Sequence, residues 1–345
     1  MTNTVKIGAA AVGGGTAITI QSMTKTDTRD AASTLAQIAE LKNAGCDIIR
    51  LAVPDEKAAL ALYEIRKQTD MPLVADIHFD HKLALIAADA GVDKIRVNPG
   101  NLAKSEHIKA VADACRARGI PIRIGVNGGS LSKSILNRFG GATPEALVAS
   151  GLEQAEMFEN YGFSDIVLSF KASNVADTVA ANRLARSRCA YPFHLGLTEA
   201  GTPYNGIIKS AAAIGALLLD DIGDTVRVSL TADPVEEVRA AKSLLRALGL
   251  RRGGVEIISC PTCGRCRADV IGLAEELERR LEGVEKSLTV AVMGCGVNGP
   301  GEARHADIGV AAGSDGFVLF EKGEIIGKCD DPLRAVLEFV NPEVD

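Results

Sequence analysis

Four cysteines near the C-terminus have the spacing of a metal or redox site. Cys260, Cys263 and Cys266 occupy every third position of the run CPTCGRC, and Cys295 follows later in the run GCGVNGPGEA. Two consecutive Cys-x-x-Cys steps, with a distant cysteine beside a loop rich in glycine and proline, favour an iron–sulfur cluster. Four thiolates also suit a tetrahedral structural zinc ion, so zinc remains an alternative.

The other four of the eight cysteines lie outside this pattern, and we interpret them as small hydrophobic residues: Cys46, Cys115, Cys189 and Cys329. The N-terminal run MTNTVKIGAAAVGGG lacks the charged start and long apolar core of a secretory signal. Cysteines in a chain without such a signal indicate metal or redox chemistry rather than disulfide bonds. We therefore expect a cytoplasmic protein.

A second set of polar side chains occurs at or near the ends of short apolar runs. In chain order these residues are Arg50, Asp76 with His78, Arg96 with Asn98, Arg123 with Asn127, Ser169 with Lys171, His194 with Glu199, and Ser229 with Thr231. Any one of them could form an ordinary salt bridge. Three arginines and a lysine at one place, however, would repel one another unless an anion neutralised them, and guanidinium groups suit phosphate oxygens. We expect a phosphorylated or diphosphorylated small molecule to bind there.

Several members of this set could act on protons rather than on phosphate. Asp76, His78, His194 and Glu199 are ionisable, and they suit acid–base catalysis, binding of a substrate hydroxyl, or pairing with the arginines. The sequence leaves these three roles open. Lys209, which we place in the first turn of a helix after the seventh strand, would add a contact near the usual phosphate site of a barrel.

Alternating strands and helices are expected to bring these residues together. Runs typical of strands occupy residues 16–23, 47–53, 73–79, 94–100, 121–129, 165–171, 193–201 and 225–232, and a segment with helical spacing follows each. This order and length predict an α/β fold, a (β/α)8 TIM barrel with its chemistry at the carboxyl ends of the strands. A doubly wound sheet is the alternative. The glycines at 13–15 precede the first strand instead of following it, which argues against a dinucleotide-binding turn.

The last hundred or so residues form a different pattern and predict a second domain. Strand-like runs at 255–259, 288–294, 306–312 and 317–328 alternate with helical segments at 267–282 and 332–340. We therefore divide the chain into a barrel over 1–249 and a small α+β iron–sulfur domain over 250–345.

Composition excludes two classes of partner. The 345 residues carry a net charge of −6, and aromatic residues make up 4%, so neither a basic surface nor stacking platforms for nucleic acid are expected. No apolar run approaches the roughly 18 residues of a membrane span. The anion site must then be a local concentration of cations in an acidic protein.

Seven motifs give the chain a family resemblance: QSMT (21–24), ADIHF (75–79), RVNPGN (96–101), RIGVNGGSL (123–131), HLGLTEAG (194–201), SCPTCGR (259–265) and MGCGVNGPGEA (293–303). With these motifs the chain resembles the bacterial 4-hydroxy-3-methylbut-2-enyl diphosphate synthase family nearly from end to end. The resemblance implies a [4Fe–4S] cluster held by Cys260, Cys263, Cys295 and the carboxylate of Glu302.

The resemblance also implies a reaction. The family opens the ring of 2-C-methyl-D-erythritol 2,4-cyclodiphosphate with two electrons from ferredoxin or flavodoxin, and it removes one oxygen as water. The residues implied to hold the substrate are Arg50, Asp76, Arg96, Asn98, Arg123, Asn127, Ser169, Lys171, His194, Lys209 and Ser229. His78 and Glu199 are our candidates for proton transfer, and the iron bound by Glu302 would exchange its oxygen ligand for the substrate.

Cys266 is an addition to the family pattern, and we interpret it as a thiol that does not bind the cluster. We also expect a head-to-tail homodimer. A final barrel helix over about 234–249 spans some 24 Å and carries the second domain toward the end of the barrel opposite the arginines. A cluster would then cover the barrel of the partner. Two other classes remain open: a phosphate-binding barrel enzyme with a structural zinc module, and an iron–sulfur redox sensor without catalysis.

Overall fold

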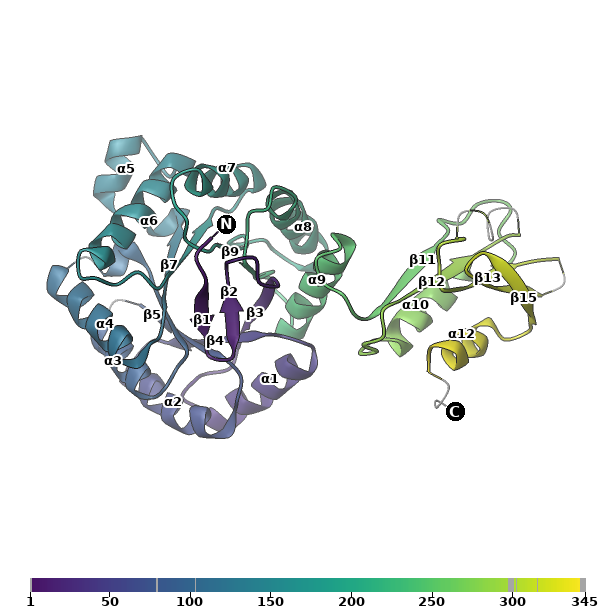
Figure 1. Cartoon of the computed structure of the whole chain (residues 1–345), viewed down its shortest axis with the longest axis horizontal. Helices are drawn as coiled ribbons and strands as arrows, with labels where there is room; N and C mark the ends of the chain where they lie inside the picture. The colour runs from purple at the N-terminus through teal and green to yellow at the C-terminus, as the bar shows by residue number, and fades with distance from the viewer. Residues whose placement is uncertain are drawn as a thin grey trace. The chain divides into compact units, whose positions relative to one another are not determined.

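The computed structural model describes residues 2–78, 80–102, 104–296, 301, 303–314 and 316–341. The chain divides into two compact units, residues 1–251 and 252–345, which are described separately (Figure 1).

Eight parallel strands form the sheet of the first unit, in the order β8-β7-β6-β5-β4-β3-β10-β9. A parallel bridge between Leu168 and Phe193 joins the two ends of this order and closes the sheet into a barrel. The predicted (β/α)8 architecture is therefore confirmed. The strands are β3 (Thr19–Met23), β4 (Ile48–Val53), β5 (Leu73–Ile77), β6 (Lys94–Val97), β7 (Ile122–Asn127), β8 (Ile166–Lys171), β9 (His194–Leu195) and β10 (Thr225–Val226).

Helices surround the barrel (Figure 1). They are α1 (Ala31–Asn43), α2 (Glu56–Gln68), α3 (His81–Asp89), α4 (Ser105–Arg118), α5 (Lys133–Phe139), α6 (Pro144–Glu159), α7 (Val175–Arg186), α8 (Pro203–Leu219) and α9 (Pro234–Ala247). Most begin at a side chain that accepts a hydrogen bond from the first turn, as Asp30 does for α1 and Asp55 for α2. These caps fix where each helix leaves the strand end before it.

Two predicted strands are much shorter than their apolar runs. The run 193–201 keeps only His194 and Leu195 in the sheet, and the run 225–232 keeps only Thr225 and Val226. In the first of these, the backbone reverses at Glu199, which has a φ of 55°. The chain therefore leaves the sheet early on this side, and the residues that follow form loops at the carboxyl ends of the strands, which we call the mouth.

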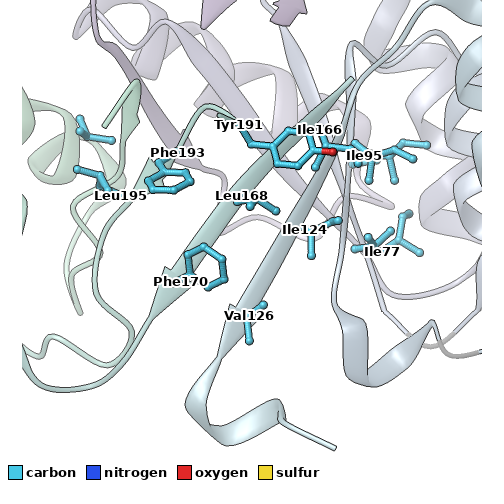
Figure 2. Close-up of a cluster of buried hydrophobic side chains, with 14 of the residues drawn as sticks. Ile77, Ile95, Ile124, Val126, Ile166, Leu168, Phe170, Tyr191, Phe193 and Leu195 are labelled. Atoms are coloured by element: carbon cyan, nitrogen blue, oxygen red, sulfur yellow. The ribbon is translucent and has the colours of Figure 1, made fainter. Parts of the chain in front are cut away.

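Residues along the barrel strands alternate between the surrounding helices and the barrel interior. Ile95, Ile124, Leu168 and Phe170 belong to the main apolar core and lie together in Figure 2, where they follow successive strands. Phe170 and Phe193 meet edge to face with ring centroids 6.0 Å apart. The strand residues that alternate with these apolar residues point into the barrel interior, and most of them are polar.

An N-terminal hairpin, which the sequence did not predict, covers the end of the barrel opposite the mouth. It consists of β1 (Val5–Ile7) and β2 (Ala10–Val12), which lie across the centre of the barrel in Figure 1. Ile7 and Val12 pack against Ile48 and Val74 near the starts of their strands. The amide of Asn3 donates to the carbonyl of Ala190, just before β9 (2.8 Å). We call this apolar closure the plug.

The second unit is an α+β module, as predicted. Its five-stranded sheet has the order β11-β12-β13-β14-β15, with β11, β12 and β13 parallel and the last two strands antiparallel. Its elements are β11 (Val255–Ser259), α10 (Val270–Arg280), β12 (Leu288–Met293), β13 (Ile308–Ala312), β14 (Phe317–Glu321), β15 (Glu324–Cys329) and α12 (Pro332–Val340). Among the described residues of both units, every helix is too short or too polar to cross a membrane.

Candidate functional site

Asp76 is the central carboxylate of the mouth. It lies at the end of β5, is 3% exposed, and pairs with Arg50 from β4 and with Arg96 from β6 (Nη1 to Oδ1, 3.0 Å). His78 Nε2 lies 3.3 Å from its other oxygen, Oδ2. Burial raises the pKa of Asp76, but the charge of Arg50, the hydrogen bond with His78 and the charge of Arg96 outweigh it and hold this pKa well below its usual range. Three predicted site residues are thus gathered by one anion.

A glycine on the neighbouring strand makes room for Arg96. A Cβ at Gly125 would lie 2.8 Å from the Nε of Arg96, and Arg96 Nη2 donates to the carbonyl of Gly125 (3.3 Å). A second glycine does the same for Lys171 of β8, since a Cβ at Gly196 would lie 2.6 Å from its Nζ. The barrel interior is therefore shaped around long cationic side chains.

Arg123 of β7 is buried at 2% exposure and lacks a carboxylate partner within the described part of the chain. Its Nε and Nη1 atoms make no hydrogen bond there either. Burial, and then repulsion from Arg50 and Arg96, lowers its pKa well below the usual arginine value. A buried, unpaired guanidinium is energetically costly. Such a group indicates that an anion from outside the described chain completes the site.

Lys171 and His194 lie in the same cationic environment. Both are buried, and burial followed by repulsion from Arg123 lowers the pKa of each well below its usual range. His194 Nδ1 lies 3.4 Å from the hydroxyl of Thr225, while its Nε2 is buried without a partner among the described residues. A neutral imidazole with a free nitrogen in this position can accept or donate one hydrogen bond to a ligand.

Arg227 is a cation of the mouth that the sequence reading missed. It follows β10, and its guanidinium makes three contacts of 3.2–3.4 Å with Glu237, a buried residue of α9. Glu237 also accepts from the hydroxyl of Ser22 (3.2 Å) and the amide of Leu230 (3.1 Å). Arg227 lies two residues before Ser229, so the alternation of side chains along a strand places both on the same face. This spacing could have identified Arg227 from the sequence.

Lys94 is the second missed cation. It lies at the start of β6, two residues before Arg96, and is fully buried. Its Nζ has no hydrogen-bond partner in the described ranges. Together with Arg50, Arg96, Arg123, Lys171 and Arg227, it makes six cations. Their carboxylate partners within the described chain are Asp76 and Glu237, and Glu237 also pairs with Lys25 (3.5 Å).

Asn98 has a structural role at the rim of the mouth. Its Nδ2 donates to Ser130 Oγ (2.7 Å), and its Oδ1 accepts from the amide of Gly100 (3.0 Å). Ser130 in turn donates to the carbonyl of Asn127 (3.0 Å). These bonds join the loops after β6 and β7. Ser169 is buried on β8, and Ser229 is half-buried after β10.

Glu199 and Lys209 lie farther out than the other predicted residues. Glu199 is exposed, in the loop after β9, and its φ of 55° is unusual for a residue other than glycine. The placement of Lys209 in the first turn of its helix was wrong. Because Pro203 begins α8, Lys209 is the seventh residue of that helix, in its second turn, and it is exposed.

The cysteines follow the carboxyl ends of two paired strands of the second unit. Cys260 comes directly after β11 and Cys295 two residues after β12, and Ser259 pairs in register with Val292. The amide of Gly294 donates to the sulfur of Cys260 (3.2 Å). Cys263 is exposed, and a hydrogen bond from the backbone amide of Arg265 lowers the pKa of its thiol. Thiolate character and strand-end placement suit a metal centre.

Cys266 lies beside Cys260. A Cβ at Gly294 would lie 2.4 Å from the sulfur of Cys266 and 3.3 Å from that of Cys260, so only glycine fits between them. The thiol of Cys266 donates to the carbonyl of Ala268 (3.2 Å). Glu302 lies outside the described residues. Among the residues that are described, no group of three or more Cys, His, Asp or Glu side chains is arranged to hold a metal ion. The thiols of Cys260 and Cys263, close together at this strand end, nevertheless suit iron as ligands of a cluster.

These features define a class: a two-unit protein whose TIM barrel has a cationic mouth and whose second unit carries thiols at its strand ends. Residues 2–242 match the family model described as the GcpE TIM-barrel domain, and residues 256–341 match that of the GcpE protein C-terminal domain. The chain therefore belongs to the GcpE family.

Curated relatives cover nearly the whole chain. The chain is 58% identical over 325 residues to a protein of Caldanaerobacter subterraneus subsp. tengcongensis, covering 94% of this chain and 92% of that protein. It is 52% identical over 343 residues to one of Ruminiclostridium cellulolyticum, covering 99% and 97% respectively. Both relatives are named 4-hydroxy-3-methylbut-2-en-1-yl diphosphate synthase (flavodoxin).

Solved structures share the barrel. A truncated 3-deoxy-D-arabino-heptulosonate 7-phosphate synthase from Thermotoga maritima matches with a TM-score of 0.51 and 17% identity, over 72% of this chain and 94% of that one. A type I 3-dehydroquinate dehydratase from Clostridium difficile matches with the same TM-score and identity, over 72% and 98%. At this identity the likeness supports the fold alone.

Proposed function

We propose that the chain is a 4-hydroxy-3-methylbut-2-enyl diphosphate synthase of isoprenoid biosynthesis, as its relatives are named. It would reduce 2-C-methyl-D-erythritol 2,4-cyclodiphosphate, open its ring and release one oxygen as water. The dianionic cyclic diphosphate, two electrons and one proton give the trianionic linear diphosphate and one water. Flavodoxin, which the relatives' name includes, is the proposed electron donor, and ferredoxin is the alternative.

The observation that carries this proposal is the unpaired cationic charge of the barrel mouth. Arg50 and Arg96 pair with Asp76, and Arg123 has no carboxylate in direct contact within the described chain. A diphosphate supplies the missing charge, and its oxygens suit guanidinium donors. We propose that these arginines, with Lys171 and Arg227, hold the diphosphate. Asn127, Ser169, His194 and Ser229 would contact the rest of the substrate, with Asn98 fixing the rim.

Proton transfer is assigned to His78 and Glu199. The ring of His78 is oriented by Asp76 and by Arg96, whose Nη1 lies 3.2 Å from His78 Nε2. It can therefore present a proton at a fixed place next to the diphosphate. Glu199 would reach the site from its loop beyond β9. Lys209 is the weakest member of the proposed set, because it is exposed on α8.

We propose that Cys260, Cys263, Cys295 and Glu302 hold a [4Fe–4S] cluster, which supplies electrons one at a time when bound. The hydrogen bond from Gly294 to Cys260 and the lowered pKa of Cys263 support thiolates at two of these positions. The domain roles follow: residues 1–249 bind the cyclodiphosphate and residues 250–345 carry the cluster. A cytoplasmic, head-to-tail homodimer stays a prediction.

Anaerobic purification followed by iron and sulfide analysis and an assay with the cyclodiphosphate and reduced flavodoxin tests the function. We expect about four irons and four sulfides per chain, a brown protein, and turnover to the linear diphosphate. Zinc without visible absorbance would instead support a barrel enzyme with a structural zinc module. A cluster without turnover would support a redox sensor.

A pair of variants tests the ligand set. Cys266→Ser is expected to keep nearly all of the iron and its visible absorbance, because the Cys266 thiol already bonds to the carbonyl of Ala268. Glu302→Ala is expected to lose most cluster content or activity. Iron and sulfide content is measured for both after identical anaerobic preparation. Loss of the cluster in Cys266→Ser, together with its retention in Glu302→Ala, would reverse the assignment.

A further inference from the structure

Lys94 is a buried amine that the proposed reaction does not use. Lys94 begins β6, and its side chain is 0% exposed. The register pairs Lys94 with Val74, a residue of the plug, whereas Arg96 pairs with Asp76 nearer the mouth. Lys94 thus lies one step below the cations of the mouth and next to the closed end of the barrel.

The surroundings of Lys94 offer it almost no negative charge. The titratable and charged groups on the barrel strands and strand ends around it are Arg50, Asp76, His78, Arg96, Arg123, Lys171, His194 and Arg227. The nearby carboxylates already have cationic partners: Asp76 pairs with Arg50 and Arg96, and Glu237 pairs with Arg227 and Lys25. Asp93, which directly precedes Lys94, pairs with Arg66 (2.8 Å). Gln21 of β3 is buried, and its amide atoms, like Lys94 Nζ, lack a hydrogen-bond partner among the described residues.

The charge state of Lys94 follows from this environment. Burial, followed by repulsion from Arg123 and Arg50, lowers its pKa well below the usual lysine value. Lys94 also lies close enough to His194 that its charged form would repel a protonated imidazole there. In the free protein the neutral amine is favoured, because a further charge would add to those already unpaired. An anion bound on the mouth side of Arg123 favours the protonated amine instead, because the anion attracts a positive charge at Lys94.

We propose that Lys94 is a further positioning residue of the diphosphate site, an amine that takes up a proton when a diphosphate enters the mouth and then supports Arg123 from below. This rests on the proposed function of the mouth as a diphosphate site. Without a ligand, a neutral Lys94 adds no further repulsion to the cations of the mouth. With a diphosphate bound, the protonated Lys94 adds a favourable charge. The same device suits the reaction, because the linear product carries one more negative charge than the cyclic substrate.

Calorimetry with inorganic pyrophosphate tests this in the full chain. Binding heats measured at neutral pH in buffers of different ionisation enthalpy give the number of protons taken up. Lys94→Met is expected to take up about one proton fewer than the unchanged protein, and to bind pyrophosphate about tenfold more weakly. Lys67→Met, at an exposed position of α2, is the matched control and is expected to behave as the unchanged protein does.

The outcomes separate the inference from the function on which it rests. If the unchanged protein fails to bind pyrophosphate, the diphosphate site itself is wrong. If it binds and Lys94→Met takes up the same number of protons, the role of Lys94 is overturned, whatever the affinity. Methionine keeps the length of the side chain and removes an unpaired amine, so the variant is expected to fold, as thermal unfolding will show. A Lys94→Met chain that does not fold would also contradict an amine that is neutral and unpaired in the free protein.

Discussion

Replacing Arg123 with methionine is expected to stabilise the free protein by about 1–3 kcal/mol, because it removes a buried cation without a partner and fills the same space with apolar atoms. The same change is expected to weaken pyrophosphate binding by at least about a hundredfold, since several charge-assisted hydrogen bonds are lost. Urea unfolding and titration calorimetry measure the two effects. This combination of higher stability and lost affinity is what a residue kept for a ligand should show.

Arg116→Met provides the comparison. Arg116 lies on α4, is exposed, and pairs with Asp113 at 2.7 Å, so its loss should change stability by no more than about 0.5 kcal/mol and leave binding unchanged. A less stable Arg123→Met protein with undiminished affinity for pyrophosphate would show that Arg123 supports the fold and not the ligand.

Replacing Asp76 with asparagine is expected to have the opposite effect on stability. Asp76 is the common partner of Arg50 and Arg96, and its loss leaves the largely buried Arg50 and the buried Arg96 uncompensated. Breaking a buried pair in this way costs about 3–5 kcal/mol. Pyrophosphate should restore part of the lost stability, because a ligand that binds only the folded state stabilises it and here also replaces the missing charge.

Thermal unfolding with and without pyrophosphate measures this prediction. Asp113→Asn is the matched control, since Asp113 also receives two cations, Lys109 and Arg116, but on the surface of α4. Its change should leave the unfolding temperature nearly unaltered, with no response to pyrophosphate. Equal losses in the two variants would argue against a special role for the buried carboxylate.

The barrel and much of the mouth could be predicted because alternation is visible in sequence. Asp76 and Arg96 end apolar runs, where a charged residue signals the mouth. Lys94 and Arg227 were not predicted, because each lies near the start of its run. A single charged residue at such a position is easily interpreted as solvent-exposed. The closed barrel is needed to see that both side chains are internal. The packing of α9 is needed to see that Glu237 is the partner of Arg227.

Other features depended on contacts that the sequence does not reveal. The hairpin of the plug consists of two three-residue strands beside a run of glycines, too short for a periodic pattern. Asn98 directly follows β6, a position that predicts a substrate contact, yet its amide group joins two loops through Ser130 and Gly100. Lys209 was expected in the first turn of its helix, but the helix begins at Pro203, which puts Lys209 in the second turn.

The plug has a consequence for the order of events in the barrel. Ile7 and Val12 pack with Ile48 and Val74 in an apolar layer, so we expect ligand, water and protons to enter the barrel through the mouth. A diphosphate held by the arginines then stands between Lys94 and the solvent. The proton for Lys94 must therefore arrive before the anion is seated or together with it, and it can leave only after the anion does. Because the barrel is closed at the other end, we expect Lys94 to stay protonated for as long as the diphosphate is bound.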